Sequence, residues 1–184
     1  MKKTISLLLC AAIFICCGNG IDDVFTVMDD AKFKEYCKTF DTNNDGKLSI
    51  DEAQAVISIH VYEKGIVSLK GIEYFTNIIY LGCDDNKLVT LDVSKNTALE
   101  QLSCINTNLT NLDVSKNTKL IAMWCYQNNL TSLDISKNMD LEELGCTNNP
   151  LLTNIYVWAG FDIASPNNSI TNIYKDEHNN FIIK

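Results

Sequence analysis

A six-residue motif recurs every 21 residues in the middle of the chain and constrains its fold more than any other feature. LDVSKN occupies residues 91–96 and 112–117, and LDISKN occupies residues 133–138. Ten residues before each copy lies an L-x-C or M-x-C element, and a fourth such element begins at Leu144. A fixed step of this length is typical of a solenoid, in which each coil buries its apolar side only against neighbouring coils.

Each coil follows the pattern L-x-x-L-x-C-x-x-N-x-L, which resembles a leucine-rich repeat with cysteine at the third apolar position. The LDVSKN half follows nearly the same pattern, so we predict two short strands per coil, one on each side. A degenerate earlier coil is visible in Val56, Ile59, Val61 and Ile66. The pattern therefore predicts a mainly β solenoid of about five 21-residue coils over residues 56–162.

The end of the chain departs from this pattern. After Leu151 the register slips by one residue, so that Ile155 takes the place of Leu133. Residues 163–184 lack the repeat signature and carry aromatic side chains. Because the open end of a solenoid must be covered, we predict an irregular C-terminal cap over these residues.

The first 17 residues are typical of an export signal, with two lysines followed by an apolar run. This run is too short to span a bilayer as a helix, which needs roughly 20 residues. The segment resembles a bacterial lipoprotein leader, which implies lipidation of Cys17; lipidation of Cys16 and ordinary cleavage are the alternatives. Residues 18–28 are then expected to form a tether, and the pair Asp22-Asp23 loosely resembles a signal for the outer leaflet of the outer membrane.

Residues 41–52, DTNNDGKLSIDE, match the loop of an EF-hand position for position. We predict a calcium site in an EF-hand-like helix-loop-helix cap over residues 29–58. Its ligands are expected to be Asp41, Asn43, Asp45, the carbonyl of Lys47, Ser49 through a water molecule, and Glu52. A turn rich in Asp and Asn without metal is the alternative. No second loop of this kind occurs, so the expected Ca²⁺ would stabilise the cap rather than operate a paired sensor.

The leader, the loop and the repeats together resemble a group of Gram-negative leucine-rich-repeat surface lipoproteins. Residues 67–79 resemble the linker into the repeats of internalin-like bacterial surface proteins. The resemblance covers nearly the whole chain and implies a scaffold for binding at the cell envelope, on the outer membrane and exposed at the surface. It names no ligand, because repeats of this kind serve many partners.

Cysteines 83, 104, 125 and 146 form a ladder with the same 21-residue step. They occupy an inward position, and thiols on parallel neighbours point alongside one another, which favours packing over bridging. We therefore predict free, buried thiols, with a disulfide as the alternative in an exported protein.

No motif indicates an enzyme. The two histidines, His60 and His178, stand outside any recognisable catalytic pattern, and the chain has no serine elbow, phosphate loop or HExxH motif. The formal charge of −8 disfavours nucleic acid and anionic membranes as partners. Without Lys2 and Lys3 of the leader, 13 basic and 23 acidic residues leave −10.

Alternation along the L-x-C strands turns the residues between and beside the Leu and Cys positions outward. Trp124 and Tyr126 form an outward aromatic pair typical of a binding surface, although Trp124 could instead only cover its neighbours. The predicted ligand-binding face comprises Tyr80, Gln101, Ser103, Trp124, Tyr126 and Glu143.

These features predict a lipid-anchored binding module for a protein or glycan at the cell surface. It would contact membrane only through its N-terminal lipid, would not bind nucleic acid and is expected to be a monomer. A structural or accessory envelope protein without a specific ligand is the alternative.

Overall fold

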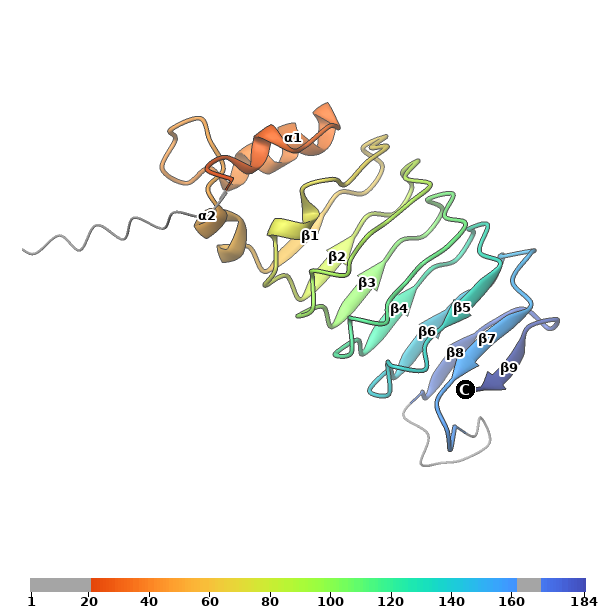
Figure 1. Ribbon diagram of the computed structural model, residues 1–184. Helices are drawn as coiled ribbons and strands as arrows, with labels where there is room; N and C mark the ends of the chain where they lie inside the picture. The colour runs from red at the N-terminus through yellow and green to blue at the C-terminus, as the bar shows by residue number, and fades with distance from the viewer. Residues whose placement is uncertain (1–20, 162–169) are drawn as a thin grey trace, which may run out of the picture.

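The 21-residue step of the sequence corresponds to stacked coils whose strands pair in parallel in the computed structural model (Figure 1). The structure describes residues 21–161 and 170–184. One sheet has six strands in the order β1-β2-β3-β4-β6-β8. Its strands are β1 (Ser58–His60), β2 (Tyr80–Gly82), β3 (Gln101–Ser103), β4 (Ala122–Trp124), β6 (Glu143–Gly145) and β8 (Asn172–Tyr174).

The second sheet lies on the other side of the coils, and its three strands in the described residues are near the C-terminal end. It contains β5 (Ser132–Asp134), β7 (Asn154–Val157) and β9 (Asn180–Ile183). Isolated bridges from Asp92 to Asp113 and from Asp113 to Asp134 continue the same pairing into earlier coils. Leu133 pairs with Ile155, which confirms the predicted one-residue slip. The prediction of a β solenoid built from leucine-rich repeats is confirmed.

Leucines and cysteines of the repeat fill the interior. Leu81, Leu102, Met123 and Leu144 form one row and are fully buried. The four ladder cysteines form a parallel row, and their thiols are free and buried. Burial raises the pKa of each ladder thiol, to about 12 at Cys146. The ladder therefore belongs to the apolar core, as predicted.

Asparagine side chains join each coil to the coil before it. On the L-x-C side, Asn128 Nδ2 donates to the carbonyl of Cys104 at 2.8 Å, and its Oδ1 accepts the Leu109 N–H at 2.9 Å. On the LDVSKN side, Asn117 Nδ2 donates to the Val93 carbonyl at 2.9 Å. These side chains are buried, so they satisfy backbone groups that water cannot reach.

The N-terminal cap covers the first coil with short helices. They are η1 (Val24–Thr26), α1 (Ala31–Cys37), η2 (Lys38–Phe40) and α2 (Ile50–Ala55), and a further 3-10 turn, η3 (Ile72–Tyr74), precedes β2. Asp30 caps α1 by accepting the N–H of Phe33 at 3.0 Å. The α1 side chain of Phe33 is fully buried with its ring 6.4 Å from that of Phe75. Burying such a side chain contributes about 2–3 kcal/mol, which fixes the cap on the repeats.

Two terminal segments differ from the expectations. The described part of the expected tether, residues 21–28, packs on the cap: Val24 is fully buried and its N–H donates to the Leu48 carbonyl at 2.8 Å. Apolar side chains in this segment make burial favourable, so it is not a free tether. The segment expected as an irregular cap is more regular than predicted in its described part, because β8 and β9 extend both sheets by one strand.

Candidate binding face

The outward face of the six-stranded sheet carries all six predicted ligand-binding residues. Three rows run across its strands, set by the parallel register. The first row is Ser58, Tyr80, Gln101, Ala122, Glu143 and Asn172. The second is His60, Gly82, Ser103, Trp124, Gly145 and Tyr174. The third, two residues further along each coil, is Tyr62, Asp84, Ile105, Tyr126, Thr147 and Asp176. We call these three rows the sheet face.

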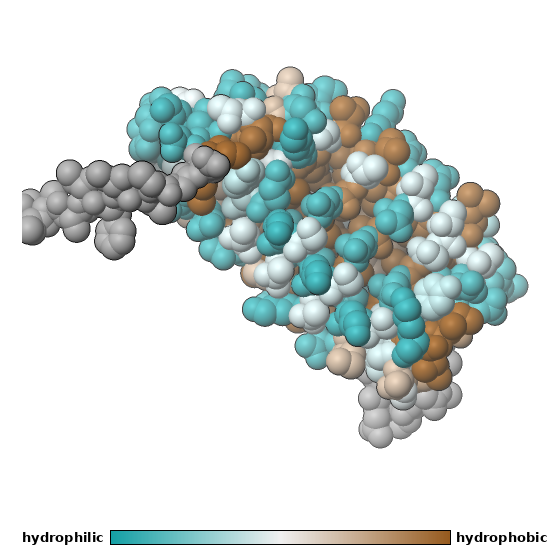
Figure 2. Space-filling view, in the orientation of Figure 1, coloured by the Kyte–Doolittle hydropathy of each residue, from teal (hydrophilic) through white to brown (hydrophobic). Residues whose placement is uncertain are grey.

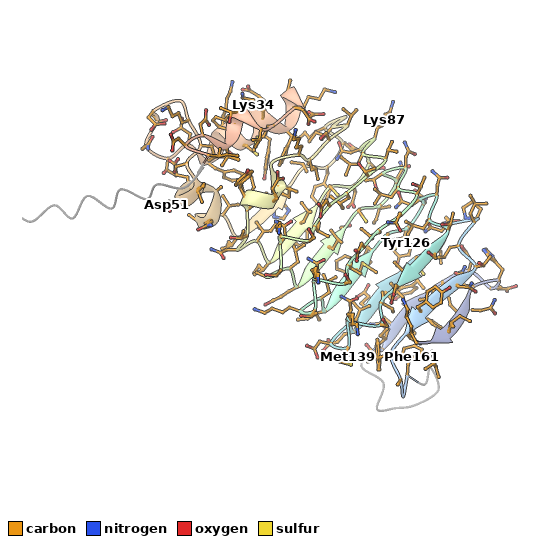
Figure 3. All side chains as sticks on the ribbon, viewed as in Figure 1. Lys34, Asp51, Lys87, Tyr126, Met139 and Phe161 are labelled. Carbon is orange, nitrogen blue, oxygen red and sulfur yellow. The ribbon has the colours of Figure 1, made fainter. Side chains whose placement is uncertain are left out.

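At the C-terminal half of the sheet face, Trp124 is held in place by its neighbour. Its indole N–H donates to Glu143 Oε1 at 2.7 Å, and the side chain is half-buried. Tyr126 comes from the turn after β4 (Figure 3) and its ring lies over Gly145, where any Cβ would collide with it. The Tyr126 and Tyr174 ring centroids are 6.5 Å apart. Trp124, Glu143, Tyr126 and Tyr174 form one group, which we call the Trp124 cluster.

A second aromatic group lies at the N-terminal half of the sheet face. The His60 ring stacks on Tyr80, with centroids 4.6 Å apart. Tyr62 hydrogen-bonds to the Tyr80 hydroxyl and lies over Gly82, as Tyr126 lies over Gly145. Partial burial and the bond to Tyr80 raise the pKa of Tyr62. The His60 N–H donates to the Tyr36 hydroxyl of α1 at 3.1 Å, which ties this second group, the Tyr80 cluster, to the cap.

Between the two clusters the sheet face is polar. Ser103 is buried and its hydroxyl donates to Asp84 Oδ1 at 2.7 Å, which also accepts the Ile105 N–H at 2.7 Å. Burial raises the pKa of the half-buried Asp84 carboxyl, and repulsion from Asp85 adds to it. Gln101 beside them is exposed.

The structure thus brings Trp124, Tyr126 and Glu143 together, while Tyr80 lies two coils away and Ser103 serves mainly to hold Asp84. Sequence reasoning missed His60, Tyr62 and Tyr174 as parts of the face. For Tyr62 a signal existed, since it stands two residues after an outward strand position in the degenerate first coil. Tyr174 had none, because its coil lacks the Leu-x-Cys signature.

The predicted metal loop is ordered by its own side chains. Asp41 Oδ2 accepts the Gly46 N–H at 2.9 Å, and Asn43 Oδ1 accepts the Asp45 N–H at 2.8 Å. Glu52 accepts from Ser49 in a capping box that begins α2, and these bonds lower its pKa to about 2. Lys47 is exposed. Over the described residues, no three Asp, Glu, His or Cys side chains gather closely enough to hold a metal ion.

The fold and the Leu-x-Cys register define a leucine-rich-repeat solenoid. Among solved structures, the chain is similar to the functional domain of InlJ from Listeria monocytogenes, which includes a cysteine ladder. The TM-score is 0.59 at 26% identity, over 88% of this chain and 44% of that chain.

Two internalins of the same organism also match. Internalin InlF gives a TM-score of 0.59 at 16% identity, over 84% of this chain and 58% of that one. Internalin C2 gives 0.52 at 13% identity, over 91% and 99%. This chain therefore spans less than two thirds of InlF and of the InlJ domain. A search with protein-family models found no match, and a search of curated proteins found none.

Proposed function

We propose that this protein is a non-enzymatic binding module that recognises a protein partner through the sheet face. The observation that carries the proposal is the Trp124 cluster, in which the Trp124 indole is held by Glu143 at 2.7 Å and remains partly exposed. An aromatic side chain that is already ordered loses little entropy when a partner covers it, which favours binding. The similarity to internalins supports a repeat scaffold of this kind.

Replacing Trp124 with alanine is expected to remove partner binding while leaving the protein folded. We expect at least a tenfold loss of affinity, because an anchor of this type contributes about 2 kcal/mol or more. The measurement is affinity capture from envelope and host extracts, with the amount of each retained protein compared between variants. Melting temperature is measured in parallel.

Leu151→Ala is the matched control, because Leu151 is also a large apolar side chain, 60% exposed, but lies outside the sheet face. A partner lost with Trp124→Ala and kept with Leu151→Ala supports the proposal. Retention patterns that are the same for all three proteins would refute it. If the captured ligand is a glycan and its binding depends on Trp124, the sheet face recognises a sugar and not a protein.

We also propose a structural Ca²⁺ in the loop 41–52, held by Asp41, Asn43, Asp45, the Lys47 carbonyl, Ser49 and Glu52. The donor set supports the proposal, since it consists of oxygens, as this hard cation requires. Two of these side chains already turn inward to bond amides of the loop. A bound ion would supply charge neutralisation for the three carboxylates and would fix the entrance of α2.

Glu52→Gln separates metal binding from helix capping, because glutamine also completes a capping box at this position. We expect the wild-type melting temperature to rise with calcium, and this rise to vanish in Glu52→Gln. At a hundredfold excess over Kd, the gain corresponds to about 2.7 kcal/mol. Asp51→Asn is the control, since Asp51 is exposed and outside the ligand set. Calcium titration calorimetry without heat for the wild type would contradict the site.

A lipid on Cys17, with surface exposure on the outer membrane, remains part of the proposal. Cys17 lies outside the described residues. Within the described residues, the helices are all too short or too polar to cross a bilayer. Mass spectrometry of the protein from its native envelope tests the lipid directly: an acylated N-terminal Cys17 is expected, and an unmodified N terminus would exclude it.

A further inference from the structure

The charges of the solenoid are divided unequally between its two sides. Four rows on one side together contain six acids but no lysine or arginine: the three rows of the sheet face and the turn positions that follow them. The turn positions are Glu63, Asp85, Asn106, Gln127, Asn148 and Glu177. The acids of the four rows are Glu63, Asp84, Asp85, Glu143, Asp176 and Glu177.

On the LDVSKN side, the acids have cationic neighbours. Lys95 lowers the pKa of Asp92, and Lys116 does the same for Asp113, each after the larger effect of the serine two residues on. Asp134 forms an ion pair with Lys184. The four rows therefore hold six acidic side chains and no basic one, whereas the acids of the LDVSKN motifs each have a lysine as a neighbour.

Among the described residues, the lysines close to the sheet face in sequence form no ion pair with its acids. Lys175 stands at the position that holds cysteine in earlier coils, and its Nζ donates to the carbonyls of Asp176 and Asn179 at 3.3 and 3.0 Å. Lys64 and Lys87 follow the turn positions. The ion pairs found between described residues, Lys38–Glu35 and Lys184–Asp134, lie elsewhere.

Asp84 is the clearest example of an acid on the sheet face without a cationic partner among the described residues. Asp84 is half-buried between the Tyr80 and Trp124 clusters, and the hydrogen bonds from the Ser103 hydroxyl and the Ile105 N–H both reach its Oδ1. Among the described residues Asp84 forms no ion pair with a lysine, and burial, followed by repulsion from Asp85, raises its pKa. A carboxylate in this setting gains more from a cation that arrives with a ligand than an exposed, already paired carboxylate does.

The aromatic clusters also favour a ligand that carries positive charge. The faces of Trp and Tyr rings attract cations, most strongly when partly desolvated. One cluster lies on each side of Asp84, around Tyr80 and Trp124. Strands about 4.8 Å apart place the first and last of the six strands about 24 Å apart, the length of about seven extended residues.

We propose that the sheet face binds an extended, arginine- or lysine-bearing segment of a protein partner, laid across the strands. Its cations contact Asp84 and Glu143 and pack on the Tyr80 and Trp124 clusters. This inference rests on the proposed function, because it names the partner chemistry of the same face.

The probe is a fluorescent nonapeptide of alternating arginine and serine, compared with the same peptide carrying glutamate in place of arginine. Fluorescence anisotropy with the purified protein is expected to give at least tenfold tighter binding for the arginine peptide. Binding should weaken at least fivefold in Asp84→Asn and in Trp124→Ala. Asp84→Asn keeps an oxygen for Ser103 and Ile105, so folding should persist, which its melting curve verifies.

Asp113→Asn is the matched control, because it removes the same charge from the opposite side. An unchanged affinity in this variant supports a specific site. Equal weakening by Asp113→Asn and Asp84→Asn, or equal affinity for both peptides, would overturn the inference. If a captured protein depends on Trp124 but not on Asp84, the binding module stands and the basic partner is excluded. If nothing depends on Trp124, both proposals fail.

Discussion

At the scale of single residues, Asp84 links the stability of the fold to the character of the sheet face. Its folded-state pKa is raised above the ordinary value of 3.8, mainly by burial. The raised pKa means that the folded protein favours the protonated form of Asp84. Protonation of Asp84 therefore stabilises the fold, and this contribution is complete below the pKa that Asp84 has in the unfolded chain. This contribution is lost as the pH rises through the folded pKa. At neutral pH the charge of Asp84 therefore destabilises the free protein.

We expect Asp84→Asn to be at least as stable as the wild type at pH 7, with the advantage disappearing as the pH falls below about 4. Urea unfolding at pH 7 and pH 3.5 measures this difference. Asp113→Asn should behave oppositely, because the Ser115 amide lowers the Asp113 pKa and favours its charged form in the fold. A loss of stability in Asp84→Asn at pH 7 would show that the carboxylate is already compensated.

At the candidate site, the sequence predicts the face on which a residue lies but not the contacts of its side chain. Strand alternation predicts that Trp124 and Glu143 both point outward, but their hydrogen bond joins neighbouring coils and depends on side-chain rotamers that a sequence pattern does not contain. The same alternation places Ser103 on the ligand face, yet its side chain is buried and its hydroxyl donates to the Asp84 carboxylate. Sequence therefore predicts which face a residue occupies better than which neighbour covers it.

At the scale of elements, buried asparagines on both sides of the coils bond each coil to the one before it, and Asn128 shows this on the L-x-C side. Asn128 satisfies the Thr107 and Leu109 N–H groups and the Cys104 carbonyl of the preceding coil. In the preceding coil, Thr107 holds the equivalent place, and its hydroxyl reaches only the Cys104 carbonyl of its own coil and Asn128. The row of inter-coil asparagine bonds on the L-x-C side is therefore weakest at Thr107, which interrupts it.

Asn128→Ala is expected to lower the free energy of unfolding by about 3 kcal/mol, because several buried backbone groups lose their partner. Thr107→Asn should raise it by about 1 kcal/mol by adding a bond to the coil before. Chemical denaturation measures both. Asn129→Ala is the control, since this side chain is exposed. Equal effects of Asn128→Ala and Asn129→Ala would mean that the inter-coil asparagine bonds contribute nothing to stability.

The elements that the sequence predicts are defined by the 21-residue period, and those that it does not predict are defined by contacts between distant residues. The coils from β2 to β7 follow from a strict period, including the slip that pairs Leu133 with Ile155. β8 pairs with β6 at an offset of 29 residues, and Lys175 replaces the expected cysteine, so the period disappears although the pairing persists. The 3-10 turn η1 depends on contact with Leu48, far along the chain, which no local pattern reveals.

At the scale of the whole molecule, one apolar interior runs from the N-terminal cap to the last coil. Phe33 and Phe40 of the cap contact Phe75, with ring centroids 6.4 and 5.9 Å away. At the other end, Phe161 packs on Phe181 at 4.9 Å. Hydrophobic side chains remain at the surface of this C-terminal end (Figure 2), and Ile183 is 63% exposed. The cysteine ladder lies between these ends.

Because the ladder is enclosed, we expect its thiols to react with Ellman's reagent only as fast as the protein unfolds. Burial removes access and raises the thiol pKa, so little thiolate exists to react. A cysteine introduced at the exposed Thr110 should react at once and serves as the control. Rapid reaction of native ladder thiols would contradict this burial, and fewer free thiols after denaturation would indicate a disulfide.

The asparagine bonds between coils have a direction. Asn86, Asn117, Asn128 and Asn149 each donate to a carbonyl of the coil that precedes them in the chain. Every coil therefore offers a template that only the following coil completes. During synthesis, the ribosome delivers the coils in this same order, so each one emerges onto a surface that is already prepared. Assembly should run as a zipper from the cap, and a nascent chain halted after any coil would hold a nearly finished structure with a single open end.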